Sequence, residues 1–185
     1  MEHFQDIFQQ AVSIKNSQMQ SRRQKFESQP QFVRAGLYYT NKYENVRNQN
    51  FNQKLIVSEY LKQSGNSHFK ANEFEKAAHE YEQSLSIFRY IKNSNKNWKN
   101  EGILDDDLEY FDEIGSNLIE NQKIKALKVM LYINLALTYL KMKKYIFSIK
   151  ASEDALKLDP LNTKALFRKA KARISDINAG FLLNL

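Results

Sequence analysis

Five polar residues on three predicted helices have the types and spacing needed to bind a carboxylate. Lys62 and Asn66 are four residues apart, as are Lys164 and Arg168, so each pair lies on one face of its helix. Asn134 stands in a third helical segment. Lysine and arginine donate charge-assisted hydrogen bonds to a carboxylate, and asparagine supplies a neutral amide donor that fixes its direction. These residues predict an anion-binding surface, provided that the fold brings the three helices together.

The elements that would position these residues form a repeated helix–turn–helix pattern. One copy includes residues 65–84, a second runs from Leu131 to Pro160, and a third begins at Thr163. Small residues recur at matching places, where they let antiparallel helices approach closely. They are Gly65, Ala77, Ser84, Ala136, Ser148, Ala155 and Ala170. The pattern resembles the tetratricopeptide repeat of 34 residues, and it predicts an all-α superhelix of about two and a half repeats with an N-terminal helical extension.

In a stacked superhelix of this kind, the first helix of each repeat lines a concave groove. The five polar residues stand at groove positions, in the motifs Lys62-Gln-Ser-Gly-Asn66, Leu131-Tyr-Ile-Asn134-Leu and Lys164-Ala-Leu-Phe-Arg168. They resemble, position for position, the two-carboxylate clamp of co-chaperone repeat domains. The resemblance implies a co-chaperone adaptor whose partner is the Glu-Glu-Val-Asp tail of a 70- or 90-kilodalton heat-shock chaperone. Leu137 and Phe167 would give the valine of that tail an apolar contact.

The first repeat departs from the repeat pattern after its second helix. Arg89 stands where a proline is expected, residues 87–91 continue the helical periodicity, and an insert follows at about 93–122. A lengthened second helix with an insert resembles the repeat domains of immunophilins, the FK506-binding and cyclophilin-type co-chaperones, over about residues 55–174. Those proteins carry an isomerase domain upstream, whereas residues 1–54 are too few and too poor in β-pattern to form one. We therefore expect a binding protein and not an enzyme.

The two ends of the chain differ from the repeats. Residues 1–54 hold eight Lys and Arg against four acids, and they are expected to form an amphipathic helix over residues 4–12 and an extended segment after Pro30. This basic extension is a candidate site for a second protein partner. Residues 175–185 are expected to form a tail. Because a repeat cannot bury its apolar face alone, we expect Phe181-Leu182-Leu183 to fold back on the preceding helix, or a neighbouring protein to cover that helix.

Composition and motifs argue against several other classes of function. The chain lacks cysteine, which removes disulfides, thiol nucleophiles and thiolate metal sites, and its three histidines lack metal-ligand spacing. No phosphate-binding glycine loop is present, so neither a cofactor nor a metal is expected. No apolar run is long enough to span a membrane. Nucleic acid is not the expected partner, although the formal charge is +7.

Two functional interpretations stay open at this point. The first is a cytoplasmic co-chaperone adaptor. The second is a structural repeat subunit of a large assembly, such as a ciliary axoneme or an organellar complex, which would place the chain in a cilium or a mitochondrion. Binding of an acidic C-terminal peptide distinguishes them, because only the first interpretation requires it.

Overall fold

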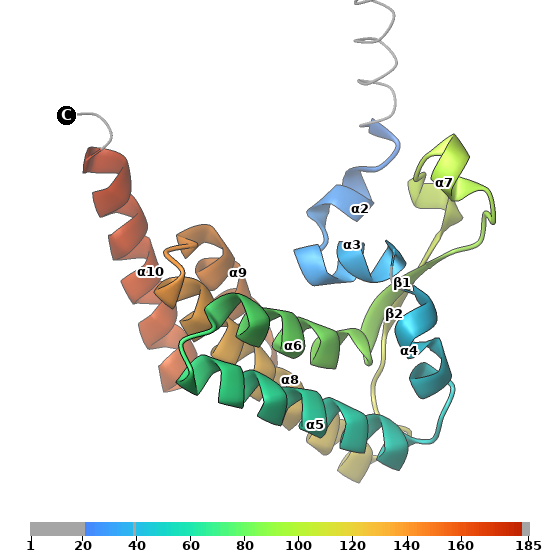
Figure 1. Cartoon of the computed structure of the whole chain (residues 1–185), viewed down its shortest axis with the longest axis horizontal. Helices are drawn as coiled ribbons and strands as arrows, with labels where there is room; N and C mark the ends of the chain where they lie inside the picture. Colours follow the sequence, from blue (N-terminus) through green and yellow to red (C-terminus); the bar gives the residue numbers. More distant parts are fainter. Residues whose placement is uncertain (1–20, 39, 183–185) are drawn as a thin grey trace, which may run out of the picture. The chain divides into compact units, whose positions relative to one another are not determined.

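The computed structural model describes residues 21–38 and 40–182, which belong to two compact units (Figure 1). The larger one, here called the repeat unit, comprises residues 41–88 and 112–185. The smaller one, here called the hairpin unit, combines the chain up to residue 40 with residues 89–111. The helix expected over residues 4–12 lies outside the described residues. No helix in the described part of the chain combines the length and the apolar character needed to cross a membrane.

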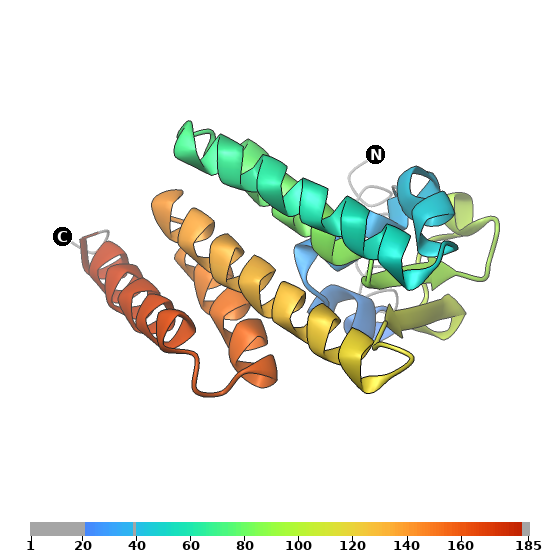
Figure 2. The ribbon, with the colours of Figure 1, turned by 90° about the horizontal axis from the view of Figure 1, so that it is seen from below.

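The repeat unit is built of helices, four of which pair as two antiparallel hairpins (Figures 1 and 2). These helices are α4 (Thr40–Arg47), α5 (Phe51–Lys70), α6 (Phe74–Ser86), α8 (Leu118–Lys141), α9 (Tyr145–Leu158) and α10 (Thr163–Leu182). Helix α5 packs on α6 and α8 packs on α9, so each pair corresponds to one predicted repeat. Helix α10 packs on α9 as the first helix of a third repeat. The predicted all-α repeat fold is confirmed.

Local sequence signals set where the two hairpins begin and turn. Asn50 and Asn117 cap α5 and α8, because each side-chain oxygen accepts a hydrogen bond from the backbone N–H three residues further on, at 3.1 and 2.9 Å. Each hairpin turns at a residue with left-handed backbone, Asn72 with φ 61° and Lys143 with φ 59°. Asparagine adopts this conformation readily, whereas lysine adopts it uncommonly. The same turn geometry therefore recurs in both repeats from different side chains.

Small residues allow the helices of each hairpin to approach closely. Six of the seven predicted small residues are buried, namely Gly65, Ala77, Ser84, Ala136, Ser148 and Ala155. A Cβ atom at Gly65 would lie 2.6 Å from the ring of Tyr81, so a larger residue there would force the ring to move. The hydroxyl oxygens of Ser58 and Ser84 are 2.6 Å apart across the contact of α5 with α6. Ala170 is exposed, because no described element covers that face of α10.

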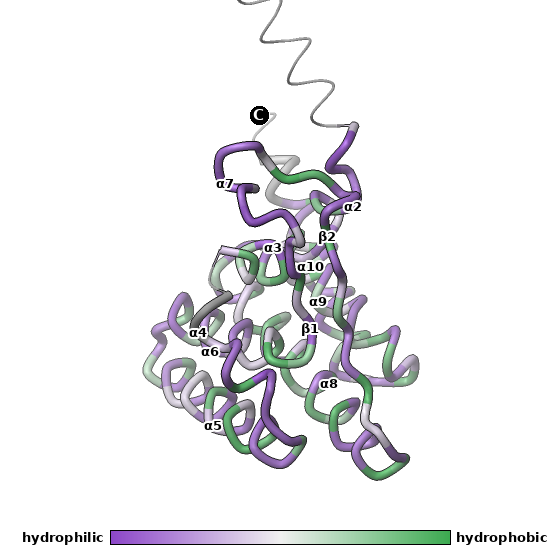
Figure 3. Tube along the Cα trace, turned by 90° about the vertical axis from the view of Figure 1, so that its right-hand side faces the viewer, coloured by the Kyte–Doolittle hydropathy of each residue, from purple (hydrophilic) through white to green (hydrophobic). Residues whose placement is uncertain are grey.

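The hairpin unit corrects the prediction of a lengthened second helix. Its elements are α2 (Gln24–Ser28), α3 (Gln31–Tyr38), β1 (Arg89–Asn93), α7 (Trp98–Glu101), the short 3-10 helix η1 (Asp105–Asp107) and β2 (Leu108–Asp112). Helix α6 ends at Ser86, and β1 pairs with β2 in a two-stranded sheet. The apolar run over residues 87–91 is short, and periodicity alone does not separate a strand from a helix at that length. The connection around α7 is mostly hydrophilic (Figure 3).

The chain after Pro30 is helical, where an extended segment was expected. Residues 31–38 form α3, which buries Phe32, Val33 and Leu37 and packs on β1. These three side chains follow helical spacing, so one face of α3 is apolar. Strand β1 thus supplies the surface that makes the helix favourable, and this contact cannot be inferred from the N-terminal segment alone.

The insert and the N-terminal extension build the hairpin unit together. The carboxylate of Asp105 accepts hydrogen bonds from the backbone N–H groups of Lys25 and Phe26, at 2.7 and 2.8 Å. It thereby satisfies donors at the start of α2 that have no partner within the helix. Trp98 packs edge to face on Tyr38, with ring centroids 5.1 Å apart. Asp105 and Trp98 of the insert therefore have structural roles in this unit.

The C-terminal helix is longer than predicted. Helix α10 continues to Leu182, so the expected fold-back of the tail is wrong: residues 181 and 182 continue α10 itself, and Leu183 lies outside the described residues. Ala165 and Ala172 are fully buried where α10 packs on its neighbours, whereas Ile174 and Ile177 are largely exposed. The described part of α10 therefore presents an apolar outer face.

Candidate peptide-binding groove

The five predicted binding residues lie on the first helix of each repeat. Lys62 and Asn66 are on α5, Asn134 is on α8, and Lys164 and Arg168 are on α10. Helix α8 lies between α5 and α10 and contacts both of them (Figure 2). The fold therefore places all five residues on three neighbouring helices of one unit.

Asn66 and Asn134 contact each other directly across α5 and α8. Asn134 donates a hydrogen bond from Nδ2 to Oδ1 of Asn66 at 3.1 Å, and the Tyr81 hydroxyl donates to the same oxygen at 2.8 Å. Because this oxygen accepts twice, the orientation of the Asn66 amide is fixed and its Nδ2 is the group that can donate to a ligand. Burial raises the pKa of Tyr81 to about 12, so its hydroxyl stays a donor at neutral pH.

Tyr81 is a residue of this site that sequence reasoning missed. It lies on α6, the second helix of its repeat, whose residues do not line the predicted groove. Its position in the repeat pattern predicts that its ring packs against Gly65, but it does not predict that its hydroxyl donates a hydrogen bond to a groove residue. The tertiary structure gives it the second role, because the ring crosses the small-residue seam and brings the hydroxyl to Asn66.

Arg168 is held in place by the backbone of α8. Its Nη1 donates a hydrogen bond to the carbonyl oxygen of Ile133 at 2.5 Å, next to Asn134. Burial lowers the pKa of Arg168, yet an arginine stays charged at neutral pH. The guanidinium has further N–H donors arranged as a planar fork that matches a carboxylate. This contact brings a charged donor of α10 beside the amide pair of α5 and α8.

A pocket of about 320 Å³ opens at the contact of α8 with α10. Its lining consists of four predicted residues, Leu137, Lys164, Phe167 and Arg168, together with Leu140, Thr163 and Lys171. Lys171 stands at a predicted groove position, seven residues from Lys164 and three from Arg168, so all three lie on one helix face, but it was not one of the five predicted clamp residues. The pocket combines three cations with an apolar wall. These are the groups that an acidic peptide with an apolar side chain would contact.

Lys62 lies on the same helix face as Asn66 but already has an acidic partner. Its Nζ is 2.5 Å from Oε2 of Glu59, one turn earlier on α5. The side chain of Lys62 is only 14% exposed, whereas that of Glu59 is 34% exposed. Lys62 and the amide pair are not part of the α8–α10 pocket lining. The structure therefore divides the five residues into a group on α5 and α8 and a group on α10, linked where Arg168 reaches α8.

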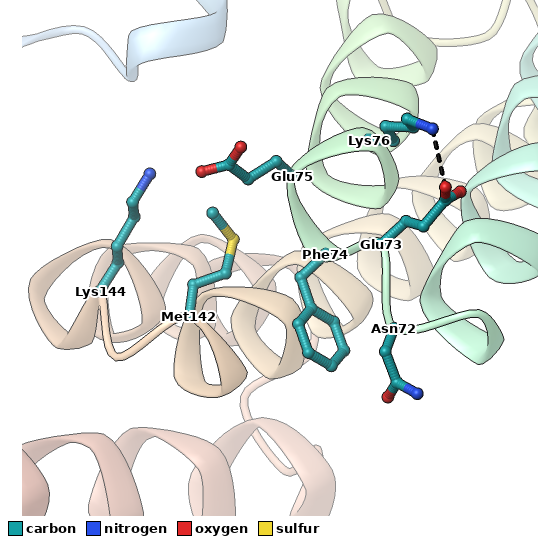
Figure 4. A pocket seen from close by; sticks show the side chains of 7 residues that line it. All are labelled: Asn72, Glu73, Phe74, Glu75, Lys76, Met142 and Lys144. Carbon is teal, nitrogen blue, oxygen red and sulfur yellow. Dashed lines mark hydrogen bonds and ion pairs between the residues drawn. The ribbon is translucent and has the colours of Figure 1, made fainter.

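A second pocket, of about 420 Å³, lies beside the turns of the two repeats (Figure 4). It is lined by Asn72, Glu73, Phe74, Glu75, Lys76, Met142 and Lys144. Figure 4 shows the side chains of Glu75 and Lys144 on either side of Met142, and Glu73 forms an ion pair with Lys76 at 2.7 Å. Two carboxylates and two ammonium groups line this pocket, so its formal charges balance. In the described residues, no group of three or more acidic or histidine side chains is placed to hold a metal ion.

Comparison with known proteins identifies relatives of the repeat region, although no family model matches the chain. Peptidyl-prolyl cis-trans isomerase FKBP4 of mouse is 28% identical over 123 residues, which cover 66% of this chain and 22% of that protein. Human FKBP4 is 28% identical over 126 residues, covering 68% and 23%. Peptidyl-prolyl cis-trans isomerase D of Kluyveromyces lactis is 31% identical over 134 residues, covering 69% and 30%. The chain thus spans less than a third of the length of these relatives.

Among solved structures, the C-terminal repeat-containing domain of an FK506-binding protein of Plasmodium falciparum matches with a TM-score of 0.49 and 23% identity, covering 74% of this chain and 83% of that one. The FKBP4 matches lie in the C-terminal, repeat-containing region of that protein, beyond its isomerase domain. The predicted resemblance to immunophilin repeat domains is confirmed. The chain carries a tetratricopeptide-repeat domain of the immunophilin type, which is a protein-interaction module.

Proposed function

We propose that this chain is a co-chaperone adaptor that binds an acidic C-terminal peptide in the groove lined by α5, α8 and α10. The observation that carries the proposal is the pair of contacts between the three helices. The hydrogen bond of Asn134 to Asn66 joins α8 to α5, and the hydrogen bond of Arg168 to the Ile133 carbonyl joins α10 to α8. These contacts bring amide and guanidinium donors from three helices onto one surface.

Each donor matches a part of such a peptide. A C-terminal aspartate presents two carboxylates, one from its side chain and one from the chain end. Asn66 and Lys62 are suited to the first carboxylate because one offers a directed amide donor and the other a charge. Lys164 and Arg168 are suited to the second, and the fork of Arg168 would bind two oxygens at once.

The apolar wall of the pocket supports a preference for a peptide with an aliphatic residue near its end. Phe167 is 66% exposed and lines the pocket with Leu137 and Leu140. Covering an aromatic ring of this kind contributes about 1.5–3 kcal/mol at full burial. The Glu-Glu-Val-Asp tail of the 70- and 90-kilodalton heat-shock chaperones has both the carboxylates and the valine, and we propose it as the ligand on the strength of the clamp resemblance.

Calorimetry with two synthetic peptides tests the proposal. Both end in Glu-Glu-Val-Asp, one as the free acid and one amidated at the terminal carboxyl. We expect the free acid to bind with micromolar affinity, about 7–9 kcal/mol. Because amidation removes one of the two carboxylates, it should weaken binding by about tenfold or more. Equal binding of the two peptides, or no binding of either, would contradict the clamp and leave the structural-subunit interpretation in its place.

A further inference from the structure

Glu59 places a carboxylate on the groove face of α5. It lies three residues before Lys62, on the same side of the helix, and its Oε2 is 2.5 Å from the Lys62 ammonium. The Lys62 side chain is largely shielded from solvent, whereas Glu59 is partly open. The Lys62 ammonium, which the proposed clamp would offer to a peptide carboxylate, is therefore already paired with the carboxylate of Glu59.

The other cations of the groove are differently placed. Lys164, Arg168 and Lys171 line the pocket at α10, and no acidic residue belongs to that lining. On α10, Lys169 and Arg173 form ion pairs with Glu153 of α9, and none of these three residues belongs to the pocket lining. Within the described repeat unit, the α5 end of the groove is thus partly neutralised while the α10 end carries uncompensated positive charge.

We infer that Glu59 is an internal competitor for Lys62, and that it sets how strongly and how selectively the groove binds anionic peptides. The inference rests on the proposed function. A peptide carboxylate that contacts Lys62 must displace Glu59 or share the ammonium with it, and it meets the negative charge of Glu59 in either case. A ligand with a neutral group at that position does not compete for the ammonium and is not repelled by Glu59. Glu59 therefore lowers affinity most for ligands that place a carboxylate at Lys62, and it narrows the preference of the groove for them over neutral ligands.

The test measures peptide binding by calorimetry in four proteins: the unchanged chain, Glu59→Gln, Lys62→Met, and the double variant. Glutamine keeps the size of the side chain and removes its charge. In the otherwise unchanged chain, Glu59→Gln should tighten binding of the free-acid peptide by about three- to tenfold. In the Lys62→Met background the same change should alter affinity by less than about twofold, because no ammonium is left to compete for. Glu73→Gln, which removes the carboxylate of another i, i+3 pair outside the groove, is the matched control and should leave affinity unchanged.

The outcomes separate the inference from the function on which it rests. If the unchanged chain does not prefer the free-acid peptide, the proposed function fails. If it does prefer that peptide but Glu59→Gln leaves affinity unchanged or weaker, only the inference on Glu59 is overturned. An equal gain in the Lys62→Met background would also overturn it, because the effect would then be general repulsion and not competition for Lys62. Circular dichroism of each variant, with a melting temperature close to that of the unchanged chain, shows that the comparisons are between folded proteins.

Discussion

Replacing Arg168 by alanine should separate the binding role of this side chain from its structural one. In the folded protein, Arg168 donates to the Ile133 carbonyl oxygen and lines the pocket with Lys164 and Phe167. Its loss would leave a peptide carboxylate unpaired in a partly enclosed site. Removing one partner of such a charged pair costs about 2–4 kcal/mol, which is about a 30- to 700-fold loss of affinity for the free-acid peptide.

The effect on folding should be smaller. The lost hydrogen bond to the Ile133 carbonyl contributes about 0.5–1.5 kcal/mol, and that oxygen lies within α8, where the helix supplies its own donor. Affinity is measured by calorimetry and stability by chemical denaturation on the same preparations. Arg173→Ala is the matched control, because Arg173 is on the same helix, contacts Glu153 and is absent from the pocket lining.

The two variants should differ clearly in peptide affinity. Arg168→Ala should lose peptide affinity with a modest loss of stability, and Arg173→Ala should retain affinity. If Arg168→Ala retained full affinity while losing several kcal/mol of stability, the side chain would be a structural bridge between α10 and α8 and not a ligand-binding group. Arg168→Lys adds a finer test, since it keeps the charge but loses the planar fork, and it should fall between the unchanged chain and alanine.

Two further predictions concern the framework of the groove. Gly65→Ala would bring a Cβ atom to 2.6 Å from the buried ring of Tyr81. The resulting overpacking should outweigh the better helix propensity of alanine and lower the free energy of unfolding by about 1–2 kcal/mol. Denaturant unfolding measures this change, and an unchanged midpoint would show that the ring moves freely. Burial raises the pKa of Glu82 above its ordinary value of 4.5, although the hydrogen bond from Tyr139 acts in the opposite direction. Because the pKa is raised in the folded state, stability is lost as pH rises through that pKa. Glu82→Gln should therefore raise the melting temperature more at pH 7 than at pH 4. An equal shift at both pH values would contradict a raised pKa for Glu82.

The repeat fold could be predicted from the sequence because its signals are local. Gly65, Ala77 and Ala136 recur where two helices must approach closely, and the structure buries all three. The groove positions could be assigned for the same reason, since helix periodicity places residues three, four and seven apart on one face. The hairpin after α6 could not be predicted in this way. The run over residues 87–91 suits either a helix or a strand, and its pairing with β2 depends on contacts distant in the sequence.

The sequence alone determined which side chains share a helix face, because that depends only on spacing within one helix: Lys62 with Asn66, and Lys164 with Arg168. Only the tertiary structure decided what each side chain contacts. It placed Asn134 against Asn66, gave Tyr81 a hydrogen bond to the same amide, and anchored Arg168 on the carbonyl of another helix. It also paired Lys62 with Glu59. Spacing allows such a pair, but whether two side chains adopt the rotamers that form it depends on the packing around them.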